Sequence, residues 1–159
     1  MTAYHIADEP LETSLSAYVV RPQVPLAAAM FAGAWLAWPW FAFNAIAMGS
    51  PTRKKEVALC AGAFAGTLVL AVVLVALVRT GVITSSLWWR LGLTAIVAFK
   101  LTMSYYISTV QERTFHVYQY YGGKLTSGRV ALIGGYLARE IVLGLVAGPV
   151  WAIIVSGAI

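Results

Sequence analysis

The hydropathy pattern shows four long apolar runs that are separated by short polar connections. A helix of roughly 20 apolar residues matches the hydrocarbon thickness of a bilayer, and each run reaches that length. The pattern therefore predicts an all-α fold, a polytopic membrane protein in which four transmembrane helices form a bundle. The predicted spans cover about residues 26–48, 56–78, 87–110 and 130–157.

Polar residues before the first run predict an N-terminal tail over residues 1–24. Leu11, Leu15 and Tyr18 recur at helical spacing, so a short helix lying on the membrane surface is one interpretation. A disordered tail is the other, since chain ends are often poorly ordered. In either case residues 25–159 form a single transmembrane domain.

The composition supports the membrane prediction. Only 11% of the 159 residues are charged and 60% are hydrophobic, with a mean hydropathy of +0.80. Soluble domains carry about 25% charged residues. The length allows one compact bundle without a separate nucleotide-binding domain. The net charge is +5, but no cluster of Lys and Arg covers a polar face, which argues against nucleic-acid binding.

Lysine and arginine near the ends of the predicted spans indicate how the bundle is oriented, because cytoplasmic loops carry the excess of these residues. Six lie at the connections between the first and second and between the third and fourth predicted spans, and three lie on the opposite side. The count predicts cytoplasmic basic loops and both chain ends outside. The residues on the cytoplasmic side are Arg53, Lys54, Lys55, Arg113, Lys124 and Arg129, and those on the opposite side are Arg21, Arg79 and Arg90. Arg53, Lys54 and Lys55 are also candidates for contact with lipid headgroups.

One lysine, Lys100, lies near the middle of the predicted span at 87–110. A charged group at that depth is costly unless it has a partner, a water-filled cavity or a route to the surface. Steps of four residues from Lys100 reach Ser104, Ser108 and Glu112. This half of the helix therefore has one polar stripe.

Glu140, preceded by Arg139, is the carboxylate that the fourth predicted span offers to Lys100. Antiparallel packing of the last two spans puts both residues about 15–18 Å from the cytoplasmic edge. We therefore predict an intramembrane ion pair between Lys100 and Glu140, with Arg139 competing for the partner role. The alternative is that Lys100 snorkels along its stripe and that Arg139 and Glu140 mark the membrane boundary.

Small residues repeat every four positions in three of the predicted spans. Such stripes let a second helix backbone approach closely within a membrane. They predict the helix-packing faces of the bundle, which are Ala29, Gly33 and Ala37 in the first span, Ala58, Gly62 and Gly66 in the second, and Gly144 and Gly148 in the fourth.

Residues that carry catalysis, metal binding or haem binding are sparse. His5 and His116 are the two histidines, and the predicted topology puts them on opposite sides. No set of Cys, His, Asp and Glu has metal-ligand spacing, and no serine has a base nearby. We therefore expect no enzymatic activity, no metal and no cofactor. Trp35, Trp38 and Trp40 either pack against neighbouring helices, which we favour, or line a site for a pigment or quinone.

Two stretches carry a resemblance to other proteins. The residues concerned are Phe41-Ala42-Phe43-Asn44 and Met48-Gly49 within 23–49, and Gln111, His116 and Gly122-Gly123 ahead of the last span. The first stretch resembles the first span of small four-span bacterial membrane proteins of uncharacterised function, and the second is similar to a loop in such proteins. The resemblance implies a four-span topology in a bacterial cytoplasmic membrane and implies no activity.

The leading functional prediction is a non-catalytic accessory or scaffolding subunit of a larger membrane complex, or a homo-oligomer. The expected partners are membrane lipids and either other membrane subunits or further copies of the chain. The alternative is a small transporter or channel for ions, protons or solutes that uses Lys100 and Glu140. Residues 91–97 offer no polar side chains to continue such a path except Thr94.

Overall fold

The computed structural model describes residues 13–156, and the regular structure of this part of the chain is entirely helical. The prediction of an all-α fold is therefore confirmed for these residues. The elements in chain order are the 3-10 helix η1 (Ser16–Tyr18) and the α-helices α1 (Gln23–Phe31), α2 (Ala34–Ala47), α3 (Arg53–Arg79), α4 (Ser86–Tyr120), α5 (Arg129–Leu145) and α6 (Pro149–Val155).

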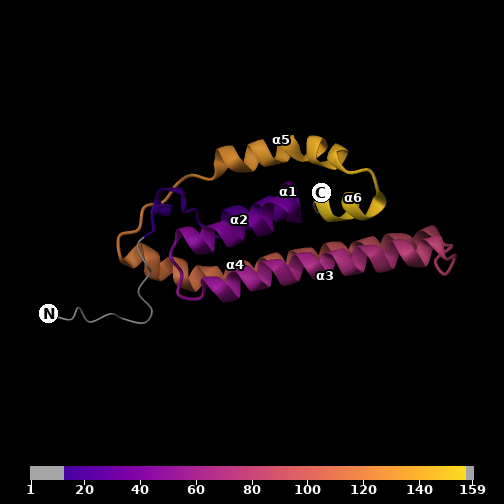
Figure 1. Cartoon of the computed structure of the whole chain (residues 1–159), viewed down its shortest axis with the longest axis horizontal. Helices are drawn as coiled ribbons and strands as arrows, with labels where there is room; N and C mark the ends of the chain where they lie inside the picture. Colours follow the sequence, from indigo (N-terminus) through magenta and orange to yellow (C-terminus); the bar gives the residue numbers. More distant parts are fainter. Residues whose placement is uncertain (1–12, 157–159) are drawn as a thin grey trace.

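Two long antiparallel helices, α3 and α4, form the frame of the molecule (Figure 1). They have 27 and 35 residues, which corresponds to about 40 Å and about 52 Å. Both are long and apolar enough to cross a membrane, and no other helix among residues 13–156 meets the same criterion. The predicted bundle of four transmembrane helices is therefore not confirmed, because two candidate spans stand where four were expected.

The first predicted span, 26–48, is a helical hairpin instead of one helix. α1 ends at Phe31, the chain reverses at Ala32 and Gly33, and α2 returns beside α1. Gly33 has a φ of 104°, which glycine adopts at little steric cost, and its N–H donates to the Ala28 carbonyl at 2.8 Å. This break corrects the prediction of a continuous helix, since a long apolar run does not distinguish a crossing helix from a buried hairpin.

The last predicted span, 130–157, is also divided. α5 ends at Leu145, and α6 begins at Pro149 after a turn in which Gly148 has a φ of 151°. Proline suits the first position of a helix because the N–H that it lacks would have no partner there. Gly148 consequently lies in a turn, which corrects its predicted place on a continuous helix-packing face.

The hairpin and α6 occupy opposite halves of the α3–α4 frame and meet end to end (Figure 1). α2 contacts the half of α4 that follows Lys100. In the other half of the frame, α6 packs against Leu74 of α3 and Ile96 of α4. A Cβ atom placed on Gly33 would lie only 2.1 Å from the Val155 carbonyl oxygen. The close approach of the two ends therefore requires glycine at position 33.

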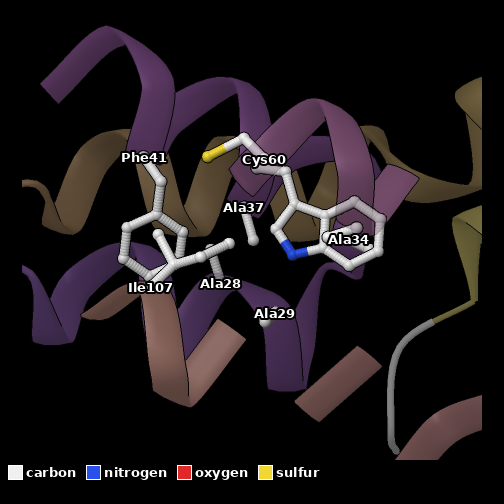
Figure 2. Close-up of a cluster of buried hydrophobic side chains, with 9 residues drawn as sticks. Ala28, Ala29, Ala34, Ala37, Phe41, Cys60 and Ile107 are labelled. Carbon is white, nitrogen blue, oxygen red and sulfur yellow. The ribbon is translucent and has the colours of Figure 1, made fainter. Parts of the chain in front are cut away.

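The core of the hairpin combines small side chains with a few large ones. Figure 2 shows Phe41, Cys60 and Ile107 around the alanines of α1 and α2. Trp38 belongs to the same cluster, and its ring lies edge-on to Phe64 with centroids 6.2 Å apart. Small side chains let α1 and α2 approach each other closely. The alanines are Ala28, Ala29, Ala34 and Ala37.

Residues 13–22 pack over the end of the molecule that carries the basic loops. Val19 is fully buried beside Met48 and Phe115, and its carbonyl accepts a hydrogen bond from the Thr126 N–H at 2.8 Å. These residues form a packed segment with one turn of 3-10 helix, in place of a surface helix or a disordered tail. The two interpretations of residues 1–12 lie outside the described part of the chain.

Candidate functional site: the polar face of α4

The candidate site is a row of buried side chains on α4 that faces the hairpin and α6. Its polar members recur every three or four residues, so they share one face of the helix. The row begins at Lys100, near the meeting point of the two broken elements, and continues toward the basic end of the molecule. The buried polar residues on this face are Lys100, Ser104, Ser108, Gln111 and Thr114.

Lys100 is bound by the C-terminal end of α6. Its ammonium group donates to the carbonyls of Ile153 at 2.9 Å, Ile154 at 3.4 Å and Ser156. These carbonyls lack intrahelical partners because the helix ends there, and the negative end of the helix dipole attracts a cation. An ammonium group has three donors, so the three carbonyls satisfy it completely.

The structure does not bring Lys100 and Glu140 together as the predicted ion pair. Lys100 is 3% exposed, whereas Glu140 lies on the exposed surface of α5. Arg139 is partly buried. The prediction placed a carboxylate beside Lys100 because the sequence contains no signal that backbone carbonyls would be free at that depth.

The remaining members of the predicted polar stripe bind the hairpin. Ser104 accepts a hydrogen bond from the Trp38 indole N–H at 3.0 Å, and Ser108 donates to the Pro22 carbonyl at 3.3 Å. The Glu112 carboxylate accepts from the Gln23 side-chain amide at 2.7 Å. The stripe is thus a set of contacts to α1 and α2, and these contacts account for its polarity.

Asn44 and Gln111 are the central polar pair of the site, and the sequence analysis missed their joint role. Asn44 is fully buried and bonds both backbone groups of Val20, at 3.0 and 3.1 Å. It also donates to Gln111, at 3.3 Å, and Gln111 donates to the Phe41 carbonyl at 2.6 Å. The available signal was an amide in each of two apolar runs, because a buried amide needs partners.

Glu56, in the first turn of α3, is a second residue that the sequence analysis missed. It is fully buried, and one carboxylate oxygen accepts hydrogen bonds from the hydroxyls of Ser50 and Thr52. The other oxygen has no hydrogen-bond partner within the described residues. The signal was a lone acidic residue after a Ser-Pro-Thr turn, which is typical of side-chain bonding at a helix start.

The predicted small-residue stripes have different environments. Ala29 and Ala37 are buried in the hairpin core, and a Cβ on Gly66 would lie 2.9 Å from the Phe99 ring of α4. In contrast, Ala58 is exposed, and a Cβ on Gly62 or Gly144 would meet no atom within 4 Å. The first group mediates packing inside the molecule, and the second group lies open on its surface.

The basic residues Arg53, Lys54 and Lys55 begin α3 and lie largely at the surface. Within residues 13–156, no group of three or more His, Cys, Asp or Glu side chains could hold a metal ion. Cys60 is a buried free thiol in the hairpin core. Trp35 donates its indole N–H to the Ala32 carbonyl at 2.7 Å, so it closes the end of α1.

Comparison with protein-family models, with curated proteins and with solved structures finds no match for this chain. The site must therefore be interpreted from its own geometry. That geometry places Lys100 at the end of α6 and Ser108 at the start of α1, whereas Ser104 and Gln111 bond groups inside α2. At the two helix ends it supplies hydrogen bonds to backbone carbonyls, which need partners where they are buried.

Proposed function

We propose that this chain is a non-catalytic integral membrane protein that binds another membrane helix through one face of α3. The observation that carries the proposal is a row of exposed small residues, here called the small-residue face, formed by Ala58, Ala61, Gly62 and Ala65. Small residues on a helix surface let a second helix approach closely in lipid. The partner is either a different membrane subunit or a second copy of the chain.

The opposite face of α3 supports this assignment because it is already used inside the molecule. Cys60, Ala63, Thr67 and Ala71 are buried against the hairpin, α4 and α6. At 100° per residue, the small-residue face points away from these side chains. A contact through it would leave the internal packing of the bundle unchanged.

Exposed apolar side chains support the membrane setting. Val69, Val130 and Ile141 are 59%, 83% and 71% exposed, and they belong to two different helices. A surface of this kind is unfavourable in water but suits contact with lipid chains or with a partner in the membrane. The setting is a bacterial cytoplasmic membrane in this proposal.

The hairpin changes the orientation that we propose for the chain. The start of α1 and the end of α2 lie at the same end of the molecule. Residues 13–22 therefore lie at the end that carries both basic connections. Seven basic residues then lie toward that end, against Arg79 and Arg90 at the other. We place the basic end in the cytoplasm. The count of seven basic residues against two fits the positive-inside rule better than the count of six against three that a four-span topology gives. Residues 13–22 are then cytoplasmic, which replaces the expectation of an external N-terminal end.

The native mass of the gently purified protein in nanodiscs tests the proposal. We expect an assembly larger than the monomer, which the substitution Gly62→Leu converts to monomer. The matched control is Gly134→Leu on α5, because a Cβ at either glycine meets open space. A wild-type monomer, or an assembly that survives Gly62→Leu, would refute the role of the small-residue face. The identity of the added mass separates a different subunit from a second copy.

A transporter or channel is the second candidate, and one observation favours it. Broken helices whose ends meet near a buried charge are typical of transporter binding sites. Here, however, the donors of Lys100 all bind carbonyls, and Glu140 lies on the outside of α5. Ion or proton flux into liposomes that is lost in a folded Lys100→Arg variant would favour transport over helix binding.

A further inference from the structure

A pocket at the basic end of the molecule combines two cations from different helices. Lys55, in the first turn of α3, and Arg113, on α4, line one cavity of about 300 Å³ together with Thr109 and Tyr106. Both cationic side chains are exposed. The cavity borders the last residue of the polar face, Thr114, and opens on the other side of α4, where Arg113 and Tyr106 are exposed.

Neither cation of this pocket is neutralised within the described residues, where both lack a hydrogen bond and an ion pair. The carboxylates that are nearest in sequence to Lys55 and Arg113 form hydrogen bonds with other residues. Glu56 is buried and accepts from Ser50 and Thr52, and Glu112 accepts from Gln23. Two positive charges therefore face one cavity with no internal counter-ion, which favours an anion as its occupant.

The order of the lining residues along α4 indicates which kind of anion fits. Arg113, Thr109 and Tyr106 follow one another at steps of four and three residues, so they form a column about 10 Å long. The column is cationic at the end of the molecule and aromatic toward its middle. A phospholipid has the same order of groups, with a phosphate beside a glycerol backbone and then acyl chains.

We propose that this pocket binds the phosphodiester headgroup of an anionic phospholipid. Lys55 and Arg113 hold the phosphate, Thr109 lies at the level of the glycerol backbone, and Val110 and Tyr106 contact the start of the acyl chains. Arg113 donates through a planar guanidinium, which suits two oxygens of one phosphate. The inference depends on the membrane setting proposed above, but it does not depend on the small-residue face.

The test uses native mass spectrometry of the full chain in nanodiscs made of phosphatidylcholine with increasing phosphatidylglycerol. We expect the wild type to retain phosphatidylglycerol. The apparent affinity for this lipid should fall at least tenfold in the double variant Lys55→Ala/Arg113→Ala, because each cation contributes about fivefold to the affinity. The matched control, Lys54→Ala/Lys124→Ala, removes the same charge from surface positions outside the pocket lining. It should keep the wild-type affinity.

Four results would overturn the proposal. Equal losses in the two double variants would mean that the lipid responds only to overall charge. Phosphatidylcholine retained as strongly as phosphatidylglycerol would exclude an anionic headgroup. Inorganic phosphate that binds with dependence on Lys55 and Arg113, while phosphatidylglycerol does not, would assign the pocket to a soluble anion. A wild-type protein that forms the expected assembly but retains no phosphatidylglycerol would refute this inference and leave the proposed function standing.

Discussion

The two halves of α4 lie in the same bundle but bury very different side chains. Between Ser86 and Phe99 the helix buries one residue, Ile96, whereas between Lys100 and Tyr120 it buries eight. The first half packs against the side of α6 through Ile96, and the carbonyls at the end of α6 lie beside Lys100, where the second half begins. The second half packs against a hairpin that has two ends and a reversal. At Lys100 and Ser108, polar side chains of α4 therefore lie where a neighbouring helix ends or begins.

The comparison suggests how this chain tolerates helix ends away from water. An unpaired backbone group in hydrocarbon costs several kcal/mol, so irregular backbone must be covered by protein. α4 provides that cover with side chains from one continuous helix. The substitutions below test this explanation in order of expected effect, by the free energy of unfolding in mixed detergent–SDS micelles.

Gly33→Ala should have the largest effect, on the order of 3 kcal/mol, because the left-handed φ is strained for alanine and the new methyl group would collide with the Val155 carbonyl. The matched control is Gly62→Ala, which meets open space and should be neutral or slightly stabilising. Equal effects of the two substitutions would mean that the end-to-end contact contributes nothing.

Lys100→Met should cost on the order of 2 kcal/mol, because the Ile154 and Ser156 carbonyls lose their side-chain donor and the Ile153 carbonyl keeps only the Ser156 hydroxyl, while the volume is nearly kept. Lys54→Met, at an exposed position on α3, should change little. A stabilised Lys100→Met protein would show that the desolvation cost of the ammonium exceeds the benefit of its three hydrogen bonds.

Asn44→Leu and Gln111→Leu should each cost about 1–2 kcal/mol, because each leaves a buried amide or backbone group without a partner. The two side chains are hydrogen-bonded to each other, so the double variant should cost less than the sum of the single variants. Strict additivity would mean that Asn44 and Gln111 act independently.

Ser104→Ala should have the smallest effect, about 0.6 kcal/mol, which is typical of one side-chain hydrogen bond inside a membrane protein. The Trp38 indole N–H loses the hydrogen-bond partner that it has among residues 13–156 in this variant. Thr94→Ala is a matched control, because the Thr94 hydroxyl bonds only its own helix at Arg90. An equal cost for the two variants would show that the Trp38–Ser104 bond adds nothing specific.

The sequence predicted the helical class and the polar stripe on residues 100–112, because both depend on local periodicity. It did not predict the hairpin, since the run 26–48 is apolar except for Asn44 and is long enough to cross a bilayer. Gly33 was interpreted as a packing glycine, although its actual role depends on Val155, which is 122 positions away.

The Lys100 partners could not be predicted for a related reason. A carbonyl becomes available only where a helix ends, and α6 ends beside Lys100 through packing against Leu74 and Ile96, which are distant from it in sequence. Asn44 and Gln111 show the same limit, because each alone is a single polar residue in an apolar run. Contacts between distant segments decide these roles.

In the membrane setting proposed above, the ammonium of Lys100 also imposes an order on the assembly of the chain during synthesis. Its carbonyl partners follow it by 53, 54 and 56 positions, so Lys100 leaves the ribosome well before they exist. Until then the lysine must remain at an interface or in another polar environment, because an unpartnered charge in lipid is costly. α4 can therefore reach its final depth only after α6 has been made, and closing the bundle is a late step in biogenesis.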